Sequence, residues 1–258
     1  MIVLQTVAVA VSMFSAVPMP QFEWNEKNMR GALAAFPLVG VLCAALTLLW
    51  ALLCRAAGFG PVLTGAGLAV APVLVTGGIH LDGFCDTSDA LASHAPREKK
   101  LEILKDSHCG AFAVIAVGCY LVFYAALASE LALTPRALAC LALTYGLTRV
   151  LSGLAVASFP CAKNSGLAHT FASLADRRLV RGVLLAELIL LAAALMFAGG
   201  LGGAAMLLAA GLTFTAYFAM SRRVFGGITG DLAGWFLQLC ELLMLFALVL
   251  AQKGGFAA

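Results

Sequence analysis

Residues 31–54 read GALAAFPLVGVLCAALTLLWALLC, an unbroken apolar run with no charged side chain. A helix needs about 20 mostly apolar residues to cross the hydrocarbon core of a bilayer, and this run is long enough to do so. Six further runs are similarly apolar, at residues 60–79, 110–129, 134–159, 183–197, 203–220 and 232–251. The sequence therefore predicts about seven transmembrane helices.

The composition agrees with a membrane protein and excludes several other classes. Of the 258 residues, 62% are hydrophobic and 11% are charged, against roughly 45–50% and 25% in a soluble globular domain. The formal net charge of +3 is too balanced for a nucleic-acid-binding surface, so no nucleic-acid partner is expected. No repeat and no polar linker divides the chain. We therefore expect one domain over residues 1–258, an all-α, polytopic bundle embedded in the lipid bilayer.

The first 18 residues are apolar, but they differ from the seven predicted spans. The segment lacks the basic start of a cleaved signal peptide and is broken by Pro18 and Pro20. We expect a retained helix that lies at the interface or re-enters the bilayer. If the segment crosses the membrane instead, the chain has eight spans and the later loops keep their sides.

Lysine and arginine residues are divided unevenly between alternate loops. Four alternate segments carry twelve of the 16 basic residues, at positions 21–30, 80–109, 161–182 and 221–231. The opposite loops carry Arg55, Arg136 and Lys253, and Arg149 lies inside a predicted span. Because positive charge is retained on the cytoplasmic side of a membrane, the four richer segments are predicted to face the cytoplasm.

One of these segments contains an acidic motif, T-G-G-I-H-L-D-G-F-C-D-T-S-D-A at residues 76–90. Asp82, Asp86 and Asp89 are spaced i, i+4 and i+7, so on a helix they share one face. At about 6 Å and an effective dielectric constant of 20, each pair of carboxylates would repel by roughly 3 kcal/mol. Such a cluster is favoured when a cation lies among its members. The alternative interpretation is a solvated face of a helix at the membrane edge.

The chemistry of the motif indicates a hard metal ion. Oxygen ligands without nearby pairs of histidine or cysteine suit Mg²⁺, and also Mn²⁺, which take further ligands from water and substrate phosphates. Gly77, Gly78 and Gly83 flank the acids and would let the backbone approach a ligand closely. His80 is a candidate general base or orienting donor. The segment 80–109 is therefore predicted to hold a metal and to support phosphoryl transfer.

Two other sets of polar residues adjoin the predicted cytoplasmic side. Lys105 and Asp106 end a short amphipathic helix predicted at residues 96–106, in the same segment as the three aspartates. Thr229, Gly230 and Asp231 end the motif G-G-I-T-G-D, just before the last apolar run. Asp106 and Asp231 are therefore candidates for completing a metal site or for acting as a base.

Charged groups inside the spans are also functional candidates, because an unpaired charge in hydrocarbon is costly. Glu241 lies deep in the last apolar run, with Gln238 on the same helix face, and Arg149 lies inside the fourth. We expect Arg149 to pair either with a carboxylate, that of Glu241 or Glu187, or with a phosphate of a ligand.

These motifs together resemble the adenosylcobinamide-GDP ribazoletransferase family, also called cobalamin synthases. The resemblance is carried by residues 76–90, K-D-S-H-C-G at 105–110, Arg149, G-G-I-T-G-D-L-A-G at 226–234 with Glu241, and F-P-L-V-G at 36–40. It covers essentially the whole chain in order.

The resemblance implies a Mg²⁺-dependent transferase of a bacterial or archaeal inner membrane, with its active site facing the cytoplasm. Its substrates would be adenosylcobinamide-GDP and α-ribazole or its 5′-phosphate, and GMP would leave. Association with further copies of the chain, or with other membrane enzymes of the corrinoid pathway, stays open.

On this assignment, the site residues fall into three groups. The metal ligands are expected to be Asp82, Asp86, Asp89, Asp106 and Asp231, with His80 as a further catalytic candidate. The phosphate-binding residues are expected to be Arg149, Gly77, Gly78, Gly83, Lys105, Thr229 and Gly230. Glu241 and Gln238 would support the site from within the membrane.

Two other functions are compatible with spaced acids in a membrane protein. A CDP-alcohol phosphotransferase also uses aspartates on a membrane helix, but its pattern requires Ala-Arg after D-G-x-x, where this chain has Asp86 and Thr87. A cation transporter should carry acids near the midplane of several helices, whereas most of these acids lie at one edge.

Overall fold

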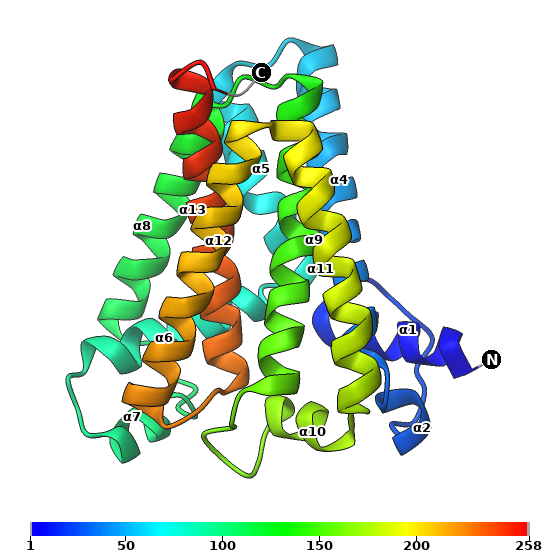
Figure 1. Cartoon of the computed structure of the whole chain (residues 1–258). Coiled ribbons are helices and arrows are strands. Elements are labelled where there is room, and N and C mark those ends of the chain that lie inside the picture. Colours follow the sequence, from blue (N-terminus) through cyan, green and yellow to red (C-terminus); the bar gives the residue numbers. More distant parts are fainter. Residues whose placement is uncertain (1, 257–258) are drawn as a thin grey trace.

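The computed structural model describes residues 2–256, and these form an all-helical bundle in which no strand occurs (Figure 1). The elements are α1 (Ile2–Phe14), α2 (Glu26–Met29), α3 (Ala32–Ala35), α4 (Pro37–Ala57), α5 (Pro61–Thr76), α6 (Ile79–Ala92), α7 (Arg97–Ile103), α8 (Ala111–Glu130), α9 (Pro135–Ser158), α10 (Leu167–Leu174), α11 (Arg177–Gly199), α12 (Leu201–Met220), the π-helical turn η1 (Ser221–Phe225) and α13 (Gly230–Lys253). The predicted all-α, polytopic membrane fold is confirmed.

Six helical segments are long and apolar enough to cross a membrane. They are Ala32–Ala57, Ala111–Glu130, Pro135–Ser158, Arg177–Gly199, Leu201–Phe225 and Gly230–Lys253. The N-terminal α1 has 13 residues, or about 20 Å of helix, which is too short to span about 30 Å of hydrocarbon. Figure 1 shows it lying across the lower part of the bundle.

The predicted span at residues 60–79 differs from the observed structure. Helix α5 has only 16 residues and ends at Thr76, and α6 leaves it at an angle of 99°. The break occurs at Gly77 and Gly78, whose φ angles of 63° and 83° lie in the left-handed region that glycine adopts at little cost. The seventh candidate span is therefore a bent pair of helices, and the acidic motif lies on its second arm.

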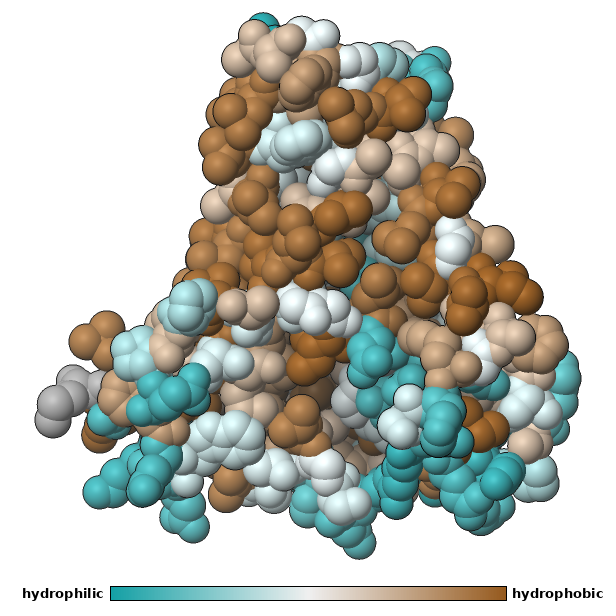
Figure 2. All heavy atoms as spheres, turned by 180° about the vertical axis from the view of Figure 1, so that it is seen from behind, coloured by the Kyte–Doolittle hydropathy of each residue, from teal (hydrophilic) through white to brown (hydrophobic). Residues whose placement is uncertain are grey.

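The ends of the bundle differ in polarity. The four segments that the charge count groups together lie at one end, with α2, α7, α10 and η1, whereas the link between α11 and α12 lies at the opposite end (Figure 1). On the rear face, hydrophobic side chains cover the upper part and hydrophilic ones gather at the lower end (Figure 2). The alternation of loops deduced from the basic residues is thus matched by the arrangement of the helices.

Close helix packing depends on small residues at the crossings. The motif F-P-L-V-G places Pro37 in the first turn of α4 and Gly40 one turn later, against α9. A Cβ atom added at Gly40 would lie 2.5 Å from the carbonyl oxygen of Tyr145. The backbones of α4 and α9 are therefore in direct contact at this point.

This contact predicts opposite effects for two glycine substitutions. Gly40→Ala should lower the free energy of unfolding by about 1–3 kcal/mol, because an added methyl group forces the two backbones apart. Gly118→Ala, in α8, meets nothing within 4 Å and should be neutral or stabilising by up to about 1 kcal/mol. Melting temperatures of the two variants in detergent test this, and equal losses would contradict the packing described.

Candidate active site

Helices α6 and α13 cross in backbone contact at the polar end of the bundle. A Cβ atom added at Gly83 would lie 2.7 Å from the carbonyl oxygen of Asp231, and one added at Gly234 would lie 2.8 Å from that of His80. Gly83 therefore acts through helix packing, since a larger residue would separate the two helices. The crossing brings Asp82 of the acidic motif close to Asp231, which is 149 positions later in the chain.

Asp82 and Asp231 line the same cavity, whose volume is about 280 Å³. Its walls come from α1, α3, α6, α9, α10 and α13, and they are mainly apolar. Asp231 is half-buried and Asp82 is exposed. We call this space the apolar cavity; two carboxylates lie at its margin.

His80 also lines the apolar cavity. The side chain is buried, and its ring meets that of Phe36 edge-on with the centroids 5.8 Å apart. Among residues 2–256, its Nε2 atom has no hydrogen-bond partner. The predicted polar candidate is thus present at the site, and its Nε2 atom is buried without a partner in the described part of the chain.

A second space, the polar cavity, adjoins the first and has a volume of about 230 Å³. The two share Leu167, Ala168, Gly230 and Asp231 in their linings, and among residues 2–256 Asp231 is the one charged residue that belongs to both. Lys105 and Thr229, both predicted phosphate contacts, line the polar cavity. The Thr229 hydroxyl donates to Oδ2 of Asp231 at 3.2 Å and accepts from the backbone N–H of Leu232, so that Thr229 caps the start of α13.

Lys163 lines the polar cavity from the loop between α9 and α10. That loop is held against residues 226–229, because the N–H of Ala162 donates to the carbonyl oxygen of Ile228 at 2.9 Å. The ammonium of Lys163 donates to the Leu101 carbonyl oxygen at 2.7 Å. Burial, followed by repulsion from Lys105, lowers the pKa of Lys163 below its usual value. The two lysines therefore form a cationic wall opposite Asp231.

The three aspartates of the motif have different surroundings. The Asp89 carboxylate accepts hydrogen bonds from the N–H groups of Gly110 and Ala113, at 2.6 and 3.0 Å, and so caps α8. Asp86 is half-buried and lies within electrostatic range of Asp82, Asp89 and Asp231. The shared helix face is confirmed, but the carboxylate of Asp89 is already engaged by backbone donors.

Asp106 lies apart from both cavities. Its carboxylate accepts from the backbone N–H of His108 at 3.0 Å and contacts that ring's Nδ1 at 2.7 Å. These contacts lower the pKa of Asp106, the backbone hydrogen bond most of all. The structure therefore does not bring Asp106 to the lining that Asp82 and Asp231 share. Gly77 and Gly78 line an open hollow beside Asp82 on the other side of α6.

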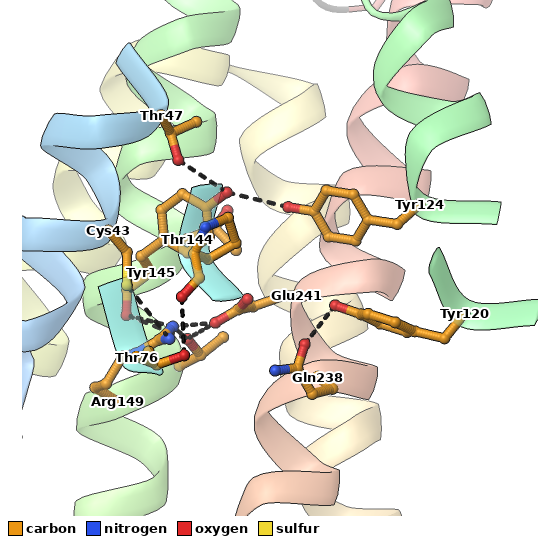
Figure 3. A network of polar contacts seen from close by, with 12 residues as sticks. Cys43, Thr47, Thr76, Tyr120, Tyr124, Thr144, Tyr145, Arg149, Gln238 and Glu241 are labelled. Carbon is orange, nitrogen blue, oxygen red and sulfur yellow. Dashed lines mark hydrogen bonds and ion pairs between the residues drawn. The ribbon is translucent and has the colours of Figure 1, made fainter. Parts of the chain in front are cut away.

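Arg149 is buried between α9 and α13 and forms an ion pair with Glu241 (Figure 3). The hydroxyl of Thr148 donates to the same carboxylate at 3.2 Å, and Arg149 also donates to the carbonyl oxygen of Tyr145 at 3.3 Å. Of the two partners proposed for Arg149, the structure supplies the protein carboxylate. Its guanidinium lines neither cavity.

Gln238 and Glu241 both support the interior of the bundle. The Gln238 amide oxygen accepts a hydrogen bond from the Tyr120 hydroxyl of α8 (Figure 3). Tyr124, one turn along α8, bonds to the hydroxyl of Tyr145 at 3.1 Å. The network joins α8, α9 and α13 deeper in the bundle than the two cavities. Gln238 and Glu241 thus lie inside the membrane-spanning part, where the sequence predicts them.

The carboxylates can be tested for their fit to Mg²⁺. Within residues 2–256, no three His, Cys, Asp or Glu side chains are grouped closely enough to enclose a metal ion. Asp82 and Asp231, however, both line the apolar cavity, and the adjoining polar cavity contains Lys105 and Lys163. Mg²⁺ is usually bound by one or two carboxylates together with substrate phosphates and water, and the pair fits that kind of site.

Comparison with known proteins identifies the family. The model for cobalamin-5-phosphate synthase matches residues 6–249. This chain belongs to the cobalamin-5-phosphate synthase family. Relatives named adenosylcobinamide-GDP ribazoletransferase include one from Lachnoclostridium phytofermentans, 38% identical over 96% of this chain and 95% of its own.

Two further relatives of the same name are more distant. One from Clostridium perfringens is 32% identical over 92% of this chain and 94% of its own. Another, from Mesorhizobium japonicum, is 30% identical over 94% and 92% respectively. No solved structure matches the chain. The family resemblance inferred from the motifs is thereby confirmed.

Some residues of the synthase site were missed in the sequence. Lys163 enters the topology argument only as a charge, although it opens the short polar loop K-N-S-G at 163–166. The aromatic residues Phe14, Phe36 and Phe171 of the apolar cavity come from separate elements and share no motif. The short polar loop that Lys163 opens was the one signal in the sequence that could have identified this lysine as a site residue.

The cap at α8 predicts that the three aspartates differ in their effect on stability. Asp89→Ala removes the acceptor for two backbone N–H groups and should destabilise the synthase by about 0.5–2 kcal/mol. Asp82→Asn should keep or raise the melting temperature, because it removes a like charge from the cluster. Melting curves without added divalent cations test this, and an equal loss in both variants would rule out the capping role.

The buried ion pair predicts a strong coupling between Arg149 and Glu241. Arg149→Met should cost about 3–5 kcal/mol, because it leaves a buried carboxylate unpaired. Adding Glu241→Leu should restore most of this loss, whereas adding Glu187→Gln should not. A double-mutant cycle on denaturation midpoints measures the coupling energy. Additive losses for Arg149 and Glu241 would show that the pair contributes nothing.

Proposed function

We propose that this protein is an adenosylcobinamide-GDP ribazoletransferase, which joins the two halves of the cobalamin nucleotide loop. The observation that carries the proposal is the position of Asp231, which lines both an apolar cavity that also contains Asp82 and a polar cavity with two lysines. The names of the relatives supply the substrates, adenosylcobinamide-GDP and a ribazole.

The reaction exchanges a phosphoanhydride bond for a phosphate ester. A ribose hydroxyl of the α-ribazole, or of its 5′-phosphate, attacks the phosphate that carries adenosylcobinamide. A new phosphorus–oxygen bond forms, the bond to the second phosphate breaks, and GMP leaves with the bonding electron pair. The hydroxyl proton passes to a base. The protein must therefore align two nucleotides, accept a proton and neutralise charge on GMP.

The surroundings of Asp231 suit the role of base. Thr229 donates to one carboxylate oxygen at 3.2 Å, which leaves the other oxygen available for a proton. Lys105 and Lys163, on the polar side, would neutralise the phosphate of the departing GMP. Asp231 thus stands where an attacking hydroxyl from one cavity meets a phosphate in the other.

Asp82 and Asp231 would hold Mg²⁺ or Mn²⁺, with Asp86 close by. When bound, the metal neutralises charge on the bridging phosphates and favours in-line displacement. The excess of basic residues at the end that contains the site supports a cytoplasmic orientation, in a bacterial inner membrane. Cation transport is less well supported, because the charges deep in the bundle, Arg149 and Glu241, neutralise each other.

The test is formation of cobalamin by the purified protein from adenosylcobinamide-GDP, α-ribazole and Mg²⁺. Asp82→Asn and Asp231→Asn should each lower kcat by about 10²-fold or more, because each removes a carboxylate from the reacting phosphates. Glu102→Gln, an exposed acid paired with Lys99 on α7, is the matched control and should retain full turnover. Chelation of divalent cations should abolish turnover, and added Mg²⁺ should restore it.

Three results would count against the proposal. Absence of cobalamin formation by a folded, metal-supplied protein would exclude the activity. Normal turnover in both aspartate variants would retain the activity but remove the assigned site. Binding of a CDP-alcohol in place of adenosylcobinamide-GDP would favour the rival phosphotransferase chemistry.

A further inference from the structure

One wall of the apolar cavity is formed by three aromatic rings that pack against one another at tilted angles. The ring of Phe14 lies 4.4 Å from that of Phe36 and 5.2 Å from that of Phe171, measured between centroids. These three side chains come from α1, the start of α4 and α10, and all three line the cavity. Aromatic walls of this kind favour flat aromatic ligands, which pack against them by offset stacking or edge-on contact.

The cavity also contains a polar side chain that could contact a ligand, that of His80. Its side chain is only 5% exposed, and its Nε2 atom has no hydrogen-bond partner within the described residues 2–256. Buried polar groups are almost always hydrogen-bonded, so an unpaired imidazole nitrogen on a cavity wall indicates a missing partner. The cavity therefore suits a ligand with an aromatic body and one hydrogen-bonding atom placed against His80.

The size of the cavity limits the ligand. At about 280 Å³ it falls at the lower end of the range for small-molecule sites, which begins near 300 Å³. A single nucleoside is of this size, whereas a corrinoid is several times larger. Of the groups in the proposed reaction, only the two nucleosides remain as occupants, the ribazole and the guanosine.

The polarity of the cavity separates these two nucleosides. Guanine carries donors and acceptors around most of its edge. Its donors could pair with Asp82 or Asp231 at the margin of the cavity, but its acceptors O6 and N7 would lie unpaired against Phe and Leu side chains at high cost. The dimethylbenzimidazole ring of a ribazole has two methyl groups and a single free ring nitrogen, an acceptor. One donor, an N–H of the His80 imidazole on the cavity wall, can satisfy that ring completely.

We propose that the apolar cavity is the acceptor-nucleoside site, with the benzimidazole ring against Phe14, Phe36 and Phe171 and its free nitrogen accepting a hydrogen bond from His80. The inference rests on the proposed function and adds the location of one substrate. With the ring in this position, the ribose lies towards Asp82 and Asp231, which share the cavity lining. His80 is then a positioning residue that recognises the base, and guanosine belongs to the polar cavity.

The proposal is tested by calorimetric titration of the purified full chain with α-ribazole, in the absence of the corrinoid substrate. The second ligand is a dimethylindole riboside, in which a C–H group replaces the free ring nitrogen. The wild-type protein should bind α-ribazole about tenfold more tightly than this analogue, which is the value of one hydrogen bond. His80→Leu should bind both ligands equally, at about the weaker affinity, whereas His108→Leu should keep the preference.

Two more measurements separate a structural effect from a direct one. Ala233→Phe, which fills the cavity from α13, should abolish α-ribazole binding and leave GMP binding unchanged. GMP should not compete with α-ribazole in the wild-type protein. Melting temperatures identify any variant that fails to fold, and the analogue preference is independent of the amount of folded protein.

The outcomes distinguish this inference from the proposed function. If His80→Leu retains the wild-type preference, or if GMP displaces α-ribazole, the inference is wrong even though turnover continues. If the wild-type protein neither binds α-ribazole nor forms cobalamin, the proposed function fails as well. Loss of the preference in His80→Leu alone, with GMP binding intact, supports the location of the ribazole.

Discussion

The ion pair between Arg149 and Glu241 fixes how the two central helices of the bundle meet. A single charge in hydrocarbon is expensive, so α9 and α13 cannot slide past each other without separating a pair whose charges have no other compensation. Helix α13 begins about 15 Å away, at Gly230, and Asp231 is its second residue. A contact deep in the membrane therefore sets the position of a carboxylate at the polar end.

The crossing of α6 and α13 adds the second constraint. Contact between their backbones at Gly83 and Gly234 permits Asp82 to share a cavity with Asp231, while Asp89, two turns along α6, reaches the start of α8. One face of α6 thus carries both Asp82, which lines the cavity, and Asp89, which caps α8. Like-charge repulsion among the aspartates is reduced because the carboxylate of Asp89 is satisfied by backbone donors rather than by a shared cation.

Much of the fold could be predicted from the sequence, because apolar runs and alternating basic loops depend on local composition. Six spans and the polarity of the two ends were found in this way, whereas the candidates Asp82, Asp231 and Lys105 came from the motifs and the family resemblance. The bend at Gly77 was not, because the apolar run continues through it. Arg149 could be limited to a carboxylate or a phosphate, and only the packing of α9 against α13 selects Glu241.

The sizes of the two cavities bear on why this chemistry takes place at a membrane. Under the proposed reaction, a nucleoside fills the space of about 280 Å³ and a guanosine phosphate lies in that of about 230 Å³. Neither can enclose a corrinoid, so only its phosphate arm can reach Asp231. The large ring must then rest outside both cavities, towards the end of the bundle where apolar side chains give way to polar ones (Figure 2). An amphipathic macrocycle is stabilised at such an interface, and the membrane would hold the substrate while the protein aligns its phosphates.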